Sequence, residues 1–251
     1  VNELIKTVTE ISPMRQIARV RQTNQKSVQM PSRTATFSAT WVAEQGSRTE
    51  TTGYTTQLEE IPTHEHYAQV DISSQMLEDS VFNLKSEMQQ EFATQLAKNE
   101  GNSFVAGDMI GKPEGITVNS SIGTTNSGSG TALTGDGLID LVHAVKSDYT
   151  RGATFVFNRT TLAAIRKLKD TAGQYVFQAG MMLTAGVPNT ILGFPYVEMP
   201  DMPDVAASAK PVAFGDFSRG YMIVDRVNLS VLRDPFTQAN TGNVRYYARS
   251  R

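Results

Sequence analysis

The sequence contains no cysteine, which excludes disulfide bonds and thiolate metal sites. No apolar run approaches the roughly 18 residues that a membrane-spanning helix requires, so we expect no membrane partner. Only 39% of the 251 residues are hydrophobic, whereas ordinary globular domains have roughly 45–50%. This chain can build a core, but its composition favours a thin or extended shape that neighbouring molecules complete.

Motifs for catalysis and for cofactor binding are also missing. The stretch "AGDMIGKP" departs from a phosphate-binding loop at Ala106, where a glycine is needed, and at Pro113, where a serine or threonine would hold magnesium. His64 and His66 would share one face of a strand, but His143, the third histidine, belongs to a separate predicted helix. No nucleophile elbow and no aromatic platform within a basic patch are present. We therefore expect no catalytic residue, cofactor or metal.

Two Gly-Asp pairs are the remaining candidates for an active site. Asp108 and Asp216 each follow a glycine at the end of a predicted element, and Asp216 opens the stretch "FGDFSRGYMIVDRVNLSVLRDPFT" after Phe214 and Gly215. A short carboxylate in that position usually bonds nearby backbone amides. We interpret both aspartates as turn and cap residues.

Charge is distributed unevenly along the first 80 residues. Residues 1–40 are mainly basic, and residues 41–80 are mainly acidic. The two segments could attract each other across a subunit boundary, or they could be two solvated surfaces without a partner. The basic residues include Lys6, Arg15, Arg19, Arg21, Lys26 and Arg33, and the acidic ones include Glu44, Glu50, Glu59, Glu60, Glu65 and Asp71.

The first third of the chain shows three kinds of pattern. Residues 34–42 are rich in Thr, Phe, Trp and Val, and residues 64–72 alternate, so both stretches predict strands. Residues 44–62 between them are polar and have little to bury, which predicts a projecting hairpin or loop. Apolar residues then recur every three or four positions over 76–106, which predicts one long helix.

The remainder alternates between helices and strands. Residues 119–137 read as a flexible linker, a helix follows from Leu138, and residues 153–157 form a short buried strand. Asn158 is expected to cap the next helix. Further strands are predicted at 191–199, at 212–214 and as one run from 221 to 231 that ends before Pro235. This is an α+β protein with an arm, a projecting loop, a spine-like helix and no catalytic constellation, an organisation that favours self-assembly.

An ordered set of segments resembles the major capsid proteins of tailed phages with the HK97-type fold. The segments are "ISSQMLEDSVFNLKSEMQQEFATQLAKNEGNSFVAGD", "GKPEGI", "LIDLVHAVKSDYTRGATFVFNRTTLAAIRKLKDTAGQYVFQ", "ILGFPYVEMPDMP" and "AFGDFSRGYMIVDRVNLSVLRDPFT". They occur in the family's order and cover most of residues 72–237, whereas residues 1–65 match by character more than by residue.

The resemblance implies a domain plan. Residues 1–26 would be the N-terminal arm and residues 44–66 the extended E-loop. The peripheral domain, with its spine helix, would comprise residues 27–43, 67–110 and 226–251, and it would carry a threefold loop at 233–242. Residues 111–225 would form the axial domain.

The resemblance also implies function, partners and contacts. Copies of the chain would form pentamers and hexamers of an icosahedral phage or prophage head, assembled in the bacterial cytoplasm with a portal and a scaffold or protease, and enclosing double-stranded DNA through non-specific contacts. An encapsulin-type nanocompartment shell is the alternative, and a hydrolase with an unrecognised site is a remote one. The expected assembly contacts are Arg15, Arg19, Arg21, Glu50, Glu59, Glu60, Arg233, Asp234, Pro235 and Phe236.

Three features depart from the family pattern. No scaffolding segment precedes Val1, which favours a terminus made by proteolysis, and the sequence stops at Arg251, where the family usually continues with a final strand. Some members join subunits through an isopeptide bond from an E-loop lysine. Because this sequence has no lysine between Lys26 and Lys85, we expect no such bond.

Overall fold

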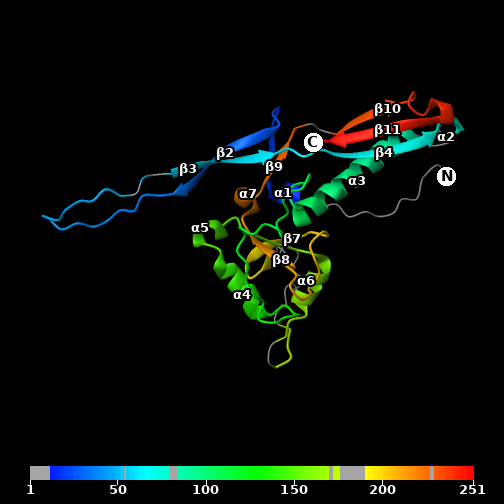
Figure 1. Ribbon diagram of the computed structural model, residues 1–251. Helices are drawn as coiled ribbons and strands as arrows, with labels where there is room; N and C mark the ends of the chain where they lie inside the picture. Colours follow the sequence, from blue (N-terminus) through cyan, green and yellow to red (C-terminus); the bar gives the residue numbers. More distant parts are fainter. Residues whose placement is uncertain are drawn as a thin grey trace.

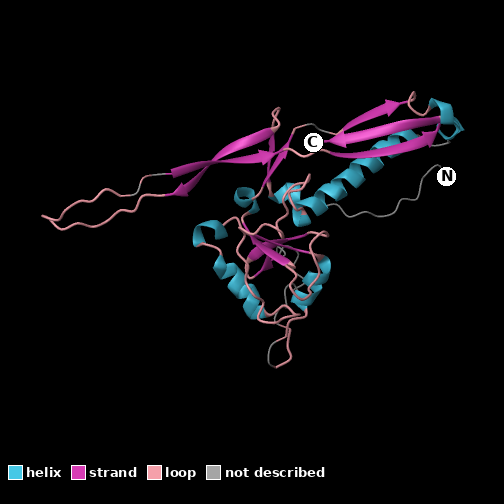
Figure 2. Cartoon of the chain, in the orientation of Figure 1, coloured by secondary structure: helices cyan, strands magenta, loops and turns pink. Residues whose placement is uncertain are grey.

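A long hairpin and a flat layer lie above a rounded body in the computed structural model of the chain (Figure 1). The structure describes residues 12–51, 53, 55–79, 84–169, 172–175, 190–226 and 229–251. Strands dominate the upper part, whereas helices flank a small sheet in the lower part (Figure 2). Among these described residues, no helix is long and apolar enough to cross a membrane.

The upper layer is an antiparallel sheet that packs on one helix. Its strand order is β10-β11-β4, and every second residue of β11 is buried, namely Val244, Tyr246 and Ala248. These side chains meet Phe92 and Leu96 of the long helix α3, because the period of the strand and the apolar stripe of the helix each supply one dry face. We call this sheet and α3 the layer. Its elements are β4 (His66–Ser73), α2 (Ser74–Asp79), α3 (Leu84–Ala106), β10 (Ser230–Asp234), η1 (Ala239–Thr241) and β11 (Asn243–Ser250).

The lower part, which we call the body, has a core of its own. Its sheet has the order β6-β7-β5-β8, with β5 parallel to β7 and antiparallel to β8. Phe155 and Phe157 of β5 are fully buried, and each such side chain contributes about 1.5–3 kcal/mol of burial free energy. The elements are α4 (Gly135–Ala144), α5 (Ser147–Thr150), β5 (Thr154–Phe157), α6 (Arg159–Arg166), β6 (Thr190–Ile191), β7 (Phe194–Glu198) and β8 (Val212–Gly215).

The projecting hairpin consists of β2 (Ser27–Ala35) and β3 (Thr55–Pro62), which pair antiparallel. The strand expected at 34–42 is therefore wrong in position, since the strand ends at Ala35 and the described residues beyond it are extended without pairing. The returning strand is β3, whereas the strand predicted at 64–72 corresponds to β4 and pairs with β11 in the layer. The polar stretch extends far from the rest of the chain, as its lack of buriable side chains predicts (Figure 1).

A third core joins the layer and the body. Short helix α1 (Met14–Ile17) leads into β1 (Arg19–Gln22), which pairs in parallel with β9 (Met222–Asp225). Helix α7 (Phe217–Gly220) precedes β9. The single strand expected over 221–231 is wrong, because β9 and β10 belong to different sheets.

Local signals in the body predicted some elements and misplaced others. The helix expected from Leu138 begins at Gly135, and a second helix, α5, follows it. Asn158 caps α6 by accepting the Thr161 backbone N–H at 2.7 Å, as predicted. The strand expected at 191–199 is instead the pair β6 and β7, joined by a turn in which Leu192 has φ 51°. Gly193, with φ 85°, is the one local signal for this turn, whereas leucine rarely adopts a positive φ.

Candidate functional site

The carboxylates of Asp216 and Asp108 accept hydrogen bonds from nearby backbone N–H groups, as predicted. The Asp216 carboxylate accepts the Ser218 backbone N–H at 3.1 Å and caps α7. Asp108 accepts the Ile110 backbone N–H at 3.1 Å. His64 lies in the loop between β3 and β4, so it does not share a strand face with His66. No group of three His, Asp or Glu residues that could hold a metal ion occurs in the described part of the chain.

A cavity of about 960 Å³ opens in the body, between residues 122–133 and residues 205–217. Its charged side chains already have structural partners. Lys210 donates to the Thr117 carbonyl at 2.6 Å, and Arg219 lies 3.4 Å from Asp216. Among the described residues that line the cavity, each charged side chain is thus paired with another group of the same chain.

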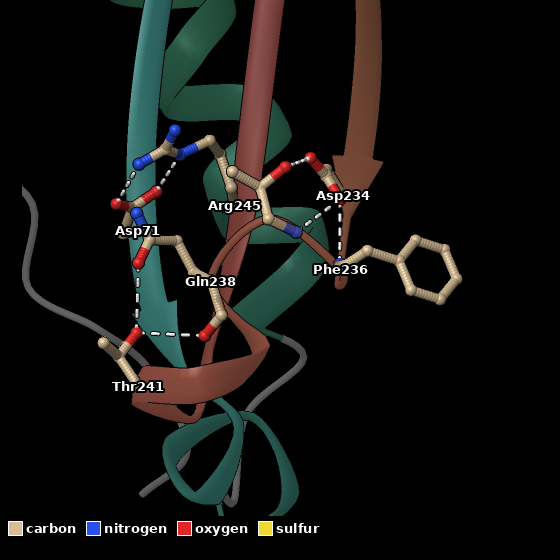
Figure 3. Close-up of polar contacts among 7 residues, drawn as sticks. Asp71, Asp234, Phe236, Gln238, Thr241 and Arg245 are labelled. Atoms are coloured by element: carbon tan, nitrogen blue, oxygen red, sulfur yellow. Dashed lines mark hydrogen bonds and ion pairs between the residues drawn. The ribbon is translucent and has the colours of Figure 1, made fainter.

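The loop after β10 is held by one carboxylate. Asp234 accepts the backbone N–H of Phe236 at 2.8 Å and that of Thr237 at 3.2 Å, and it also accepts the Thr237 hydroxyl. The Thr237 hydroxyl first, and then the two amides, lower the pKa of Asp234 below its usual value. The ring of Phe236 points away from this network and is 84% exposed (Figure 3).

An ion pair between Arg245 and Asp71 links the strands β11 and β4 near that loop. Arg245 of β11 donates to Asp71 of β4 through Nε at 2.7 Å and through Nη2 at 2.8 Å (Figure 3). The Arg245 guanidinium lowers the pKa of Asp71. Arg233 and Phe236 are exposed, while Asp234 and Pro235 are partly buried, so the loop presents one apolar ring on a rigid base.

The hairpin and the residues beyond its strands carry the predicted acidic residues together with exposed apolar ones, two of which belong to the strand that was expected at 34–42. Glu50, Glu59 and Glu60 are exposed, and Glu59 and Glu60 lie on β3. Trp41 is fully exposed. Other mostly exposed apolar side chains are Phe37 and Leu58. Of these three, only Leu58 lies within the polar stretch 44–62.

The predicted basic residues of the arm separate into two groups. Arg19 and Arg21 lie on β1 and are exposed. Arg15 instead binds two carboxylates of its own chain, Glu100 of α3 and Asp225 of β9. The structure therefore pairs Arg15 with acids of its own chain, whereas Arg19 and Arg21 are exposed on β1.

One further exposed apolar pair lies outside every predicted contact. Met109 and Ile110 occupy a tight loop after α3, and Ile110 is 82% exposed. Met109 has φ 64°, a conformation that costs about 1–2 kcal/mol for a residue with a side chain. The backbone of this loop is fixed by Gly115, whose N–H donates to the Gly107 carbonyl at 2.9 Å.

Comparisons with known proteins agree with this anatomy. A family profile described as the phage capsid family matches residues 1–251. A solved structure described as the capsid of an empty GTA particle computed with C5 symmetry is 30% identical, with a TM-score of 0.88, covering 100% of this chain and 88% of that one. The search of curated proteins finds no match.

More distant structures share the fold. A chain of Microbacterium phage Oxtober96 has a TM-score of 0.72 at 15% identity, covering 100% of this chain and 86% of its own. A chain of Mycobacterium phage Bobi has a TM-score of 0.71 at 14% identity, covering 100% and 85%.

Proposed function

We propose that this chain, which belongs to the phage capsid family and has the HK97-type fold, is the major subunit of an icosahedral head that encloses double-stranded DNA. The family is one of structural proteins that form phage capsids. The observation that carries the proposal is the match to a GTA capsid chain with C5 symmetry along the whole of this chain. The fivefold symmetry of that particle supports pentamers here, and hexamers would complete the shell.

The arrangement of the elements supports a division of the subunit into an arm, an E-loop and two domains. We assign the layer to the peripheral domain, for which the resemblance implies residues 27–43, 67–110 and 226–251, and the body to the axial domain, residues 111–225. Of the peripheral residues, 27–35 form β2 of the projecting hairpin and lie outside the layer. Residues 1–26 would be the arm, and residues 44–66 would be the E-loop. The separate hydrophobic cores of the layer and the body favour this division.

We assign contacts between copies to charged and apolar groups that one chain leaves uncovered. Arg19 and Arg21 would meet Glu50, Glu59 or Glu60 of a neighbouring copy, because segments of opposite sign attract across an interface. Arg15, given its partners within the chain, would act indirectly.

A second contact involves the loop of residues 233–242, which would meet its own copies at threefold axes. There Arg233, Asp234 and Pro235 would shape the turn that presents Phe236. A shell repeats each contact many times, so weak individual contacts suffice.

Other partners follow from the same proposal. A head needs a portal and a scaffold or protease during assembly in the bacterial cytoplasm. Packaged DNA would be held by non-specific contact. The product would be a virion capsid.

Electron microscopy of the expressed chain tests the proposal. We expect closed shells, and the variant Arg19→Glu with Arg21→Glu should yield soluble subunits with few shells. Adding Glu59→Arg and Glu60→Arg to this variant should restore shells, because the swap recovers opposite charges. Monodisperse subunits that never form shells under any condition would contradict the capsid function. Normal shells from the Arg19 and Arg21 variant would contradict only the charge contact.

A further inference from the structure

The root of the arm, residues 12–23, is built into the junction of the layer and the body. Met14 is fully buried. It shares a core with Phe104 of α3, Val156 of β5 and Ile223 of β9. One side chain of the arm therefore belongs to the same core as residues of the spine-like helix, of a central strand of the body and of the strand that leaves the body. A segment that merely lay on the surface would not contribute to such a core.

Arg15 adds a polar clamp beside that core. Its Nη1 and Nη2 atoms donate to the two carboxylate oxygens of Asp225 at 2.8 and 2.9 Å. Its Nε donates to Glu100 at 3.1 Å, and its Nη2 also bonds Glu100. The hydrogen bonds, that to Asp225 above all, raise the pKa of Arg15 above its usual value. A planar guanidinium with a fixed fork of donors sets the geometry between both acids, which a lysine could not do.

Backbone hydrogen bonds also hold the arm root to β9, the strand whose Asp225 binds Arg15. β1 runs parallel to β9 with Arg19 opposite Met222. The Arg19 N–H donates to the Tyr221 carbonyl at 3.1 Å, and the Thr23 N–H donates to the Asp225 carbonyl at 2.8 Å. Asp225 is thus held by its side chain to Arg15 and by its backbone to Thr23.

The arm root packs so closely on α3 at Gly101 that no side chain fits between them. A Cβ atom added to Gly101 would lie 2.3 Å from the Cβ of Ser12 and 2.8 Å from Oδ2 of Asp201. Glycine at this point of α3 therefore permits a close approach of the arm, the helix and the loop that follows β7.

We propose that residues 12–23 are a latch between α3 and β9, and that Arg15 is the positioning residue that sets the angle between the layer and the body. The physical basis is the pair of carboxylates. Glu100 and Asp225 bind one guanidinium, and without it two like charges would face each other across the junction and repel. Because Arg15 is partly exposed, the ion pairs contribute modestly to stability, and their main effect is geometric.

The inference rests on the proposed function in one respect, namely that the angle would be the one with which a subunit enters a shell. The latch itself is a property of the single chain. It can therefore be measured apart from assembly.

The absence of cysteine makes a distance measurement direct. Spin labels on Ala93→Cys of α3 and Ala144→Cys of α4, both at exposed positions, report the distance between layer and body by pulsed electron paramagnetic resonance. The measurement uses the full chain, in dissociated subunits and in particles. Arg15→Ala is expected to shift the mean distance and broaden its distribution. Arg15→Ala combined with Asp225→Asn should recover most of the shift, because one of the two repelling charges is gone.

Controls separate positioning from stability. Arg159→Ala removes the same charge from an exposed position on α6 and should leave the distance unchanged. If Arg15→Ala does not fold, Arg15→Lys keeps a positive charge between the two acids but lacks the planar fork of donors, and it should give a smaller shift in the same direction. A lower melting temperature with an unchanged distance distribution would overturn the latch, whether or not shells form. A shifted distance in the Arg15→Ala variant, together with a parent chain that itself never forms shells, would retain the latch and overturn the capsid function.

Discussion

The carboxylate of Asp234 accepts the backbone N–H of Phe236 at 2.8 Å, while the Phe236 ring points into solvent with 84% of its surface exposed (Figure 3). The backbone around the ring is held by a network, whereas the ring itself contacts little of its own chain. An apolar group that is held rigidly and left uncovered is typical of an anchor for another molecule. In a capsid subunit, the partner expected at this loop is another copy.

Phe236→Ala should therefore impair assembly and spare the fold. Removing an exposed ring changes the free energy of unfolding by at most about 0.5 kcal/mol, so the melting temperature should stay near that of the parent chain. Sedimentation should show fewer shells and more free subunits. Phe236→Leu keeps an apolar group and should retain more shells than the alanine variant. Equal shell yields from all three proteins would count against a contact at this residue.

Gly101→Ala should lower the free energy of unfolding, although a glycine-to-alanine change inside a helix usually raises it. Alanine normally stabilises a helix interior by about 0.5–1 kcal/mol relative to glycine. Here the added Cβ would lie 2.3 Å from Ser12, so the arm root must move, at a cost of about 1–3 kcal/mol for overpacking. Denaturant unfolding measures the change.

Gly135→Ala is the matched control for Gly101. Gly135 begins α4, and its added Cβ meets nothing within 4 Å. The substitution should be neutral or slightly stabilising. A stabilising effect at both glycines would mean that the arm root does not pack on α3 in solution.

The features that were predictable from the sequence are those whose cause is local. Asn158 caps α6 and Asp216 caps α7, because a short polar side chain before a helix finds its backbone partner two or three residues away. The apolar period of three to four residues likewise predicted one helix over 76–106. The structure has α2 and α3 in this span, and residues 80–83 of the prediction lie outside the described residues. The exposed hairpin followed from a stretch with nothing to bury.

The features that escaped prediction depend on distant partners. Glu100 and Asp225 lie 85 and 210 residues from Arg15, and no spacing rule connects them. The continuous run after Tyr221 suggested one strand, but β9 pairs with the arm and β10 with β11. β9 is buried or half-buried throughout, whereas β10 is mostly exposed, and the boundary between them is decided by the different partners with which the two strands pair.

His64 should make the stability of the chain depend on pH. Its side chain is partly buried, and this burial, with repulsion by Arg251, lowers the pKa of His64 below 6.5. The unfolded chain then binds the proton more readily than the folded one, so stability is lost as the pH falls below 6.5. We expect the melting temperature to decrease between pH 7 and about 5.5, and His64→Gln should flatten this slope.

His143→Gln provides the comparison for that measurement, because His143 is exposed on α4 and its replacement removes the same kind of group. The slope of the His143 variant should match that of the parent chain. If the two histidine variants gave the same slope as the parent, the loop at His64 would not contribute to the pH dependence.

Assembled particles should dissociate on a denaturing gel into a single monomer band. An isopeptide crosslink of the kind that some family members form needs an amine on the projecting hairpin, and this sequence has no lysine between Lys26 and Lys85. The acceptor side alone is present, since Asn240 and Asn243 lie in and just after the loop that carries Phe236. The shell would then depend on non-covalent contacts, so denaturant should release subunits without covalent oligomers. A ladder of dimers, trimers and larger species that survives boiling in detergent would show that another amine replaces the missing lysine, and mass spectrometry of the ladder would identify it.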